Sequence, residues 1–407
     1  ETDATPGDFQ ARACVRGRAI DQWLDAPDRV NWPLRRVPGT KRGEGAYERF
    51  SWDEALDTIA EAYKKVLDEY GPEAVLVQYA TGVQDSNIRN FVKRLACING
   101  GFLKTYGSYS SAQIGQALPW LYGGREANGT SDVANSKLVV LFGDNSCETK
   151  MSGGGPTYHY MMGLEKSGAK VIVIDPRFTG TSALHADQWI PIRPGTDAAL
   201  AEGIAYVLIT EDMVDQEFLD TYCIGYDEKT LPDSAPAHGD YKSHILGQGP
   251  DGTPKTPAWA SAITGIPEQT IIELAREIGT TDPCCIMQGL GPQRQQNGEQ
   301  TCRAICMLEV LLGGVGKSGA GTGFLFGADT ITGVKVPTGT NPDAITIPTF
   351  MYMEAIEDAT SLTTFNAGLQ GAGRSRSCSR TAATASPTST PTSTAVIRSL
   401  PMRACAR

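Results

Sequence analysis

The chain has 407 residues, of which 41% are hydrophobic and 20% charged, as in an ordinary globular protein with room for two or three domains. Its formal net charge is −10 and it has no run of Lys or Arg, so nucleic acid is not an expected partner. No apolar run reaches the roughly 18 residues of a membrane span, and the ten cysteines indicate neither a disulfide framework nor a zinc site.

Predicted helices and strands alternate along the chain. The first long helix, over 50–71, opens with a capping box of Ser51 and Glu54 and ends at Gly71. Apolar runs predict strands over 74–79, 137–143, 170–176 and 284–291, and periodic apolar residues predict helices over 87–98, 156–168, 195–211, 266–279 and 299–316. This alternation indicates the α/β class, with doubly wound, largely parallel sheets.

The stretch "TYGSYSSAQ" over 105–113 carries six hydroxyl groups just before a predicted helix. The simplest interpretation is a helix cap, in which Ser110 or Ser111 accepts a hydrogen bond from the first helical turn.

The predicted strands over 137–143 and 170–176, with the helix between them, form a βαβ unit. Backbone N–H groups after its first strand can hold a phosphate, and Asp175 after its second strand can bind a ribose hydroxyl. A clean G-x-G-x-x-G is lacking, so a mononucleotide-binding unit and a plain βαβ with a solvent-facing Asp both remain open.

Two further glycine-containing loops follow predicted strands. Gly195 makes a turn before Thr196 and Asp197, which either cap the next helix or reach a nucleotide base. Arg294 lies in the loop "QGLGPQRQQNGE". Three such loops at the carboxyl ends of strands favour a nucleotide-type ligand.

The cysteines have two interpretations. Cys14 lies among Arg12, Arg16 and Arg18, whose charges favour a thiolate, although a partly buried structural Cys is also possible. The remaining pairs of neighbouring cysteines are expected to be buried small hydrophobic residues: Cys284 with Cys285, and Cys302 with Cys306.

The segment from Ala367 to Arg407 has no Asp, Glu or Lys but six Arg, and it contains the low-complexity run "TASPTSTPTSTA". It is either a disordered tail or non-native sequence produced by a frame shift near Gly368. The abrupt change of composition favours the second interpretation.

Several motifs together resemble one family: "RACVRGR", "GSYSSAQ", "LFGDNSCETKMSGGG", "IDPRFT", "IPIRPGTDAAL", "YDEKTLP", "KTPAWASAITGIPEQTI" and "GPQRQQNGE". They are similar to the catalytic subunits of the bacterial dimethyl sulfoxide reductase family, which are molybdopterin oxidoreductases with two guanine dinucleotide pterins. The likeness runs from about Glu1 to about Leu362. "IRPGTDAAL" is typical of the superfamily, and "YSSAQ" with "MSGGG" indicates the sulfoxide and selenate reductase branch.

The resemblance implies roles for individual residues. Ser110 matches the protein ligand to molybdenum, Cys14 the fourth ligand of a 4Fe-4S cluster, and Arg16 the basic residue between cluster and pterin. The positions that match contacts to the pterin dinucleotides are Glu148, Thr149, Ile174, Asp175, Gly195, Thr196, Asp197, Leu290, Gly291 and Arg294. The "ATGVQDSN" loop is similar in place to another such segment but is shorter.

The function that the resemblance implies is molybdenum-dependent oxygen-atom transfer. The substrate would be dimethyl sulfoxide or a related S- or N-oxide, reduced with electrons from a quinol through iron–sulfur clusters. An iron–sulfur subunit and a membrane anchor would be partners, on the periplasmic side of the membrane. The alternatives are a selenate or other oxyanion reductase, an inactive truncated fragment, and an NAD-dependent dehydrogenase; against the last, the glycine fingerprint and a His base are lacking.

The resemblance also predicts the domain organisation. Residues 1–50 would be the remnant of a cluster domain, 51–135 with 320–366 an α/β domain around the metal-ligand loop, 136–319 a dinucleotide-binding domain, and 367–407 the tail. In the family, three further cluster cysteines precede the position that matches Glu1, and more sequence follows the match to Leu362. The chain is therefore expected to be an N-terminal and central fragment.

Overall fold

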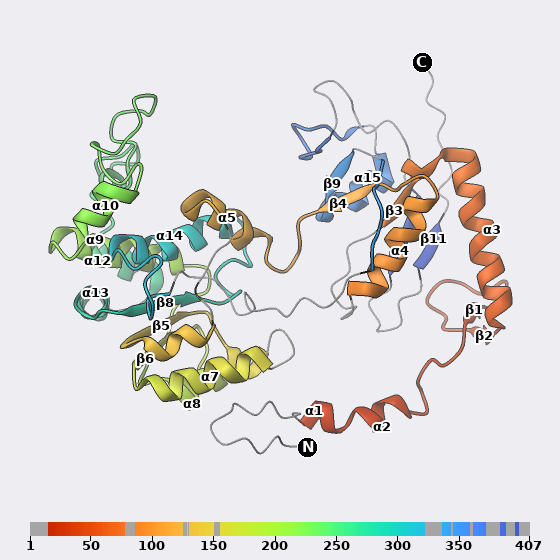
Figure 1. The fold of residues 1–407 in the computed structure, drawn as a ribbon, viewed down its shortest axis with the longest axis horizontal. Helices are drawn as coiled ribbons and strands as arrows, with labels where there is room; N and C mark the ends of the chain where they lie inside the picture. The colour runs from red at the N-terminus through yellow and green to blue at the C-terminus, as the bar shows by residue number, and fades with distance from the viewer. Residues whose placement is uncertain are drawn as a thin grey trace. The chain divides into compact units, whose positions relative to one another are not determined.

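The computed structural model describes residues 15–77, 86–124, 128, 130–149, 155–321, 336–342, 345–358, 361–371, 383–387 and 395–398. The described residues form two compact units, one within Ser110–Ile331 and the other within Ala13–Tyr109 and Thr332–Arg407 (Figure 1). Each has its own apolar core. The domain boundaries expected from the sequence stay a prediction.

The first unit is built around a four-stranded sheet in which all neighbouring strands are parallel. Its order is β7-β6-β5-β8, so the chain adds β6 and β7 on one side of β5 and then returns to add β8 on the other. This reversal between β5 and β8 confirms the predicted α/β class with a doubly wound parallel sheet. The strands are β5 (Leu138–Phe142), β6 (Lys170–Ile174), β7 (Gln188–Ile190) and β8 (Cys284–Gln288).

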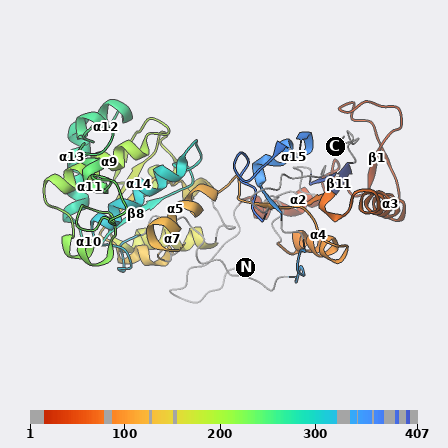
Figure 2. The same cartoon turned by 90° about the horizontal axis from the view of Figure 1, so that it is seen from above.

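Helices cover both faces of this sheet. On β5, Val140 and Phe142 pack into a core with α9 (Asp197–Thr210), α13 (Glu268–Thr280) and α14 (Gly298–Leu311). Val139 and Leu141 pack with α7 (Gly155–Ser167) on the opposite face. Figures 1 and 2 both show α9, α12 and α13 grouped together. The helices of this unit are α5 (Ala112–Tyr122), η2 (Thr130–Asn135), α6 (Ser146–Thr149), α7 (Gly155–Ser167), α8 (Gly180–His185), α9 (Asp197–Thr210), α10 (Gln216–Tyr222), α11 (Tyr241–Ile245), α12 (Pro257–Thr264), α13 (Glu268–Thr280) and α14 (Gly298–Leu311).

The second unit contains the long helix α3 (Trp52–Tyr70), and its predicted capping box is confirmed. The N–H of Glu54 donates to Ser51 Oγ at 3.2 Å, and the N–H of Ser51 donates to Glu54 Oε2 at 2.9 Å. Gly71, at φ +82°, follows the helix as predicted, because this left-handed conformation favours glycine.

Distant segments of the chain meet in the second unit. Strand β4 (Lys104–Tyr106) pairs in parallel with β9 (Thr346–Pro348), and Leu76, Leu103 and Ile347 share one apolar cluster. The other elements are α1 (Val15–Arg18), α2 (Ile20–Leu24), β1 (Leu34–Arg36), β2 (Tyr47–Arg49), η1 (Pro72–Ala74), β3 (Val75–Val77), α4 (Ser86–Ile98), η4 (Thr349–Met351), α15 (Tyr352–Asp358), β10 (Ala383–Pro387) and β11 (Ala395–Arg398).

The predicted tail contributes to this unit where it is described. Ala367 and Leu369 are buried in the same cluster as Leu76, and β10 pairs with β3. Whether the segment is native sequence stays a prediction.

Cys284, Cys285, Cys302 and Cys306 are buried, as expected for small hydrophobic residues. Among the helices that the structure describes, none combines the length and the apolar character needed to cross a membrane.

Candidate cofactor-binding site

The loops after β5 and β8 touch each other at the carboxyl edge of the parallel sheet. A Cβ atom on Gly143 would lie 2.6 Å from Pro292 Cδ, and one on Gly289 would collide with the Gly143 carbonyl oxygen. Glycine at both positions therefore allows the two loops to meet where the strand order reverses. Open α/β sheets bind their ligands at such a reversal point.

Asp144, the first residue after Gly143, is a buried acid at this edge, with only 2% of its surface exposed. Ser146 Oγ donates to Asp144 Oδ1 at 2.5 Å, and Oδ2 has no partner within the part of the chain that the structure describes. Burial raises the pKa of Asp144 to about 7, against hydrogen bonds from Ser146 that lower it, and the charge of Asp175 raises it further. Sequence reasoning missed this residue, although its place directly after the turn glycine was a usable signal.

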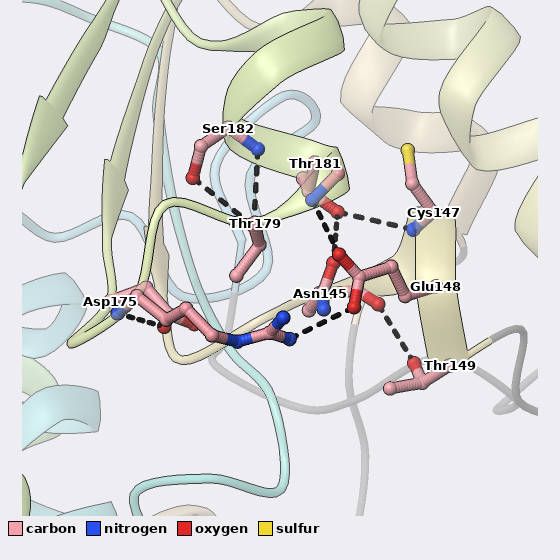
Figure 3. Close-up of polar contacts among 10 residues, drawn as sticks. Asn145, Cys147, Glu148, Thr149, Asp175, Thr179, Thr181 and Ser182 are labelled. Atoms are coloured by element: carbon pink, nitrogen blue, oxygen red, sulfur yellow. Dashed lines mark hydrogen bonds and ion pairs between the residues drawn. The ribbon is translucent and has the colours of Figure 1, made fainter.

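Glu148 and Thr149 connect the loop after β5 to its surroundings (Figure 3). The Arg177 guanidinium donates to Glu148 Oε2 at 2.9 Å, and the N–H of Gly180 donates to Oε1 at 2.7 Å. The bond from Arg177, followed by that from Gly180, holds the pKa of Glu148 at about 2. Thr149 Oγ1 donates to the carbonyl oxygen of Asn145 at 3.0 Å. Glu148 thus ties the loop after β5 to the loop after β6.

Ile174 and Asp175 end strand β6 in different environments. The side chain of Ile174 is fully buried in the core, and only its carbonyl reaches the edge, where it accepts the N–H of Gly143 at 2.9 Å. Asp175 is half-buried, and its Oδ1 accepts the N–H of Arg177 at 2.9 Å. Burial raises the pKa of Asp175, Arg177 lowers it, and Glu148 raises it.

The turn after β7 joins the same edge. Gly195 has φ +78°, and a Cβ there would collide with Gln295 Oε1 of the loop after β8. Thr196 occupies the N-cap of α9 without a side-chain cap bond; its hydroxyl donates to the Arg193 carbonyl at 2.7 Å. Asp197 is buried; burial raises its pKa to about 6, its own N–H lowers it, and the charge of Asp175 raises it.

Ser110 is held by the loop after β8. Arg294 Nη2 donates to Ser110 Oγ at 3.3 Å, and Gln293 Nε2 donates to the Ser110 carbonyl at 2.5 Å. The guanidinium Nε also lies 3.4 Å from that carbonyl oxygen. Two residues predicted from separate motifs, Ser110 and Arg294, are therefore brought together.

Gln293 also performs the capping that was expected of a serine. Its Oε1 accepts the N–H of Ile114, in the first turn of α5, at 3.3 Å. Ser111 is the N-cap residue, but at φ −138° and ψ 24° its side chain makes no cap bond. The prediction that Ser111 caps this helix is wrong, because a residue distant in sequence occupies the free N–H. Sequence reasoning did not identify Gln293.

The other predicted positions lie as follows. Leu290 is partly buried against the core on the α7 side of the sheet, and Gly291 is exposed. Cys14 and most of the "ATGVQDSN" loop are outside the described residues, and Arg16 lies in α1 with its side chain outside them. Across the described ranges, no group of three or more His, Cys, Asp or Glu side chains is arranged to hold a metal ion.

The carboxyl edge thus gathers Asp144, Asp175 and Asp197 with the guanidinium groups of Arg177 and Arg294. Guanidinium groups suit phosphate oxygens, and carboxylates accept hydrogen bonds from ribose hydroxyls or base N–H groups. This combination can hold an anionic nucleotide-type ligand beside Ser110.

Comparisons with known proteins show which family the chain matches. A model of the molybdopterin oxidoreductase family matches residues 29–380. The chain is 54% identical to YnfE of Escherichia coli (strain K12) and 50% identical to dimethyl sulfoxide reductase DmsA of the same organism, in each case over 91% of this chain and 47% of the relative. The chain therefore spans about half the length of the curated relatives it matches. Acetylene hydratase from Pelobacter acetylenicus has a similar structure, with TM-score 0.58 and 28% identity over 78% of this chain and 39% of that one.

Proposed function

Because the chain belongs to the molybdopterin oxidoreductase family, we propose that it catalyses oxygen-atom transfer from dimethyl sulfoxide or a related S- or N-oxide. The overall reaction consumes the oxide, two electrons and two protons, and yields the reduced product and water. The observation that carries the proposal is the pairing of Ser110 with Arg294 at the carboxyl edge of a parallel sheet.

The residues at this edge fit a molybdenum–pterin group that carries guanine dinucleotides. Asp144 Oδ2 is buried without a partner among the described residues, so a donor from a ligand would satisfy it. Asp175 and Asp197 would accept hydrogen bonds from a ribose or a guanine edge, and Arg177 and Arg294 would hold the diphosphate. When bound, the group supplies two-electron redox chemistry at the metal.

Ser110 would hold the metal through its hydroxyl oxygen, since a hard oxygen donor suits a high-valent metal. The Arg294 guanidinium, 3.3 Å from Ser110 Oγ, favours the deprotonated oxygen through its positive charge. Gln293 fixes the backbone of Ser110, which keeps the hydroxyl in a constant position. The chain's own residues thus supply orientation and electrostatics.

The route of the electrons rests on the resemblance alone. We propose a quinol as donor, a 4Fe-4S cluster with Cys14 as one ligand, and Arg16 between that cluster and the pterin. An iron–sulfur subunit and a membrane anchor would be partners on the periplasmic side of the membrane.

The test is an assay of reduced methyl viologen oxidation with dimethyl sulfoxide, trimethylamine N-oxide and selenate as alternative substrates. Ser110→Ala should lower turnover of the S- and N-oxides by at least about 100-fold, because it removes a direct ligand. Ser111→Ala should keep turnover within about twofold, because its side chain makes no cap bond.

Cofactor occupancy is measured as the guanosine monophosphate that acid hydrolysis releases. It should be equal in Ser110→Ala and Ser111→Ala. An inactive Ser111→Ala beside an active Ser110→Ala would overturn the ligand assignment. Turnover of selenate alone would support the oxyanion reductase instead.

A further inference from the structure

A cavity of about 1270 Å³ lies in the first unit and shares no residue with the carboxyl-edge site. Its walls come from α9, α14, the end of α5 and the segment between α10 and α12. The function proposed above makes no use of it.

Several residues that line this cavity carry buried polar atoms without a partner in the part of the chain that the structure describes. Tyr226 and Asp240 are each only 2% exposed and both line the cavity. Within the described residues, Tyr226 Oη, Tyr241 Oη and Asp240 Oδ2 have no hydrogen-bond partner. Buried polar atoms are nearly always paired, so three such atoms in one cavity indicate that a ligand or water completes them.

The charge of this floor is negative. Asp240 Oδ1 accepts the N–H of Ser243 at 2.8 Å as the N-cap of α11, which leaves Oδ2 for a ligand. Glu202 on α9 also lines the cavity, and its Oε1 lies 3.2 Å from His244 Nε2. Asp240 is the buried carboxylate of this floor, and a cation placed beside Oδ2 would be attracted electrostatically.

The two tyrosines remain neutral hydroxyls at ordinary pH. Burial raises the pKa of Tyr226 to about 12, and nearby acids that include Asp227 and Asp240 raise it further. Burial also raises the pKa of Tyr241, and the charge of Glu202 adds to the shift. Each hydroxyl can therefore accept a hydrogen bond from a cationic head.

The mouth of the cavity is apolar and exposed. Trp120 and Ile224 are each 82% exposed, and Tyr222 is 75% exposed. Positive side chains also lie nearby: Lys317 Nζ is 3.7 Å from Asp215 Oδ2, Arg303 donates to the neutral Gln300, and Lys242 Nζ lies 5.9 Å from the centroid of the Tyr226 ring. Aromatic faces attract cations and cover apolar groups, so this mouth suits the body of an amphiphilic ligand.

We infer that this cavity binds an organic cation, with an ammonium head at Asp240, Tyr226 and Tyr241 and an apolar body against Trp120 and Tyr222. An ammonium group has three N–H donors, which can pair with carboxylate and hydroxyl oxygen atoms.

The test is calorimetric titration of the 407-residue chain with three probes that share one aromatic body. Phenethylamine should bind, 2-phenylethanol should bind at least about tenfold more weakly, and phenylacetate should not bind, because only the amine carries the positive charge. Equal binding of amine and alcohol, or no binding of the amine, would mean that only water fills the cavity and would overturn the inference.

Variants locate the binding. Asp240→Asn keeps an N-cap oxygen but loses the charge, so it should weaken the amine at least about tenfold with an unchanged melting temperature. Tyr226→Phe should weaken the amine but raise the melting temperature of the free chain, because it removes an unpartnered buried hydroxyl. Glu202→Gln gives a second loss of charge should Asp240→Asn fail to fold.

Asp187→Asn is the matched control. Asp187 Oδ2 also accepts a backbone N–H, that of Val171 at 2.8 Å, but the residue does not line the cavity. Amine affinity should be unchanged in this variant. Equal losses in Asp187→Asn and Asp240→Asn would mean that net charge, rather than this cavity, attracts the probe.

Discussion

Asp144 shows how the fold can shift the ionisation of one residue. Its carboxyl group lies where two glycine-containing loops touch, so water reaches almost none of it. The hydroxyl of Ser146 satisfies one oxygen, and the other has no partner among the described residues. Burial then outweighs the hydrogen bonds and raises the pKa of Asp144 to about 7.

This shift predicts a specific pH dependence of stability. The folded pKa of about 7 lies above the ordinary value of 3.8, so the folded chain holds this proton more tightly than the unfolded chain. The free energy of unfolding should therefore fall as pH rises from about 4 to about 7, by at most about 1.4 kcal/mol per pH unit from this residue. Asp144→Asn keeps an oxygen for Ser146 and should remove that part of the fall, measured by urea unfolding from pH 4 to pH 8.

The wild-type chain, unfolded under the same conditions, is the control. A wild-type slope that persists in Asp144→Asn would show that other groups carry the dependence.

At the scale of elements, two helices begin after a serine, but the serine side chain caps only one of them. Helix α3 is capped by its own Ser51 and Glu54, close in sequence, so the motif alone predicted it. The first turn of α5 is bonded instead by Gln293, which lies 179 residues from Ile114. Local propensity cannot reveal a cap that another loop supplies.

This difference predicts amide exchange rates. Ser51→Ala should speed hydrogen exchange at the Glu54 amide by about fivefold, the equivalent of about 1 kcal/mol, because its acceptor is lost. Ser111→Ala should leave exchange at Ile114 unchanged, whereas Gln293→Ala should speed it. Exchange at Ile114 that responds to Ser111→Ala but not to Gln293→Ala would contradict the assignment.

The strands also differ in whether the sequence alone predicts them. β5, β6 and β8 were predictable because each is a run of mainly buried apolar residues. β7 is only three residues long and partly exposed, so no periodic signal marked it. Its existence follows from pairing with β6, which is a tertiary interaction.

At the scale of the whole molecule, the α/β class follows from the alternation of helices and strands, the order of the strands does not, and the site follows only in part. The motifs singled out Ser110, Asp175, Asp197 and Arg294 as candidate site residues. Their metal-binding and cofactor-binding roles were predicted from the resemblance to a family. Asp144 and Gln293 matter through contacts with other loops, and sequence spacing does not encode these.

The central claim is that the carboxyl edge of the sheet binds the guanosine diphosphate end of a pterin dinucleotide. The most direct measurement is calorimetric titration of the 407-residue chain with GDP, with ADP as competitor. Our account predicts that GDP binds, that ADP binds at least about tenfold more weakly, and that Asp175→Asn lowers GDP affinity by a similar factor while Asp240→Asn leaves it unchanged. Absence of GDP binding, or equal GDP affinity in Asp175→Asn and wild type, would contradict it.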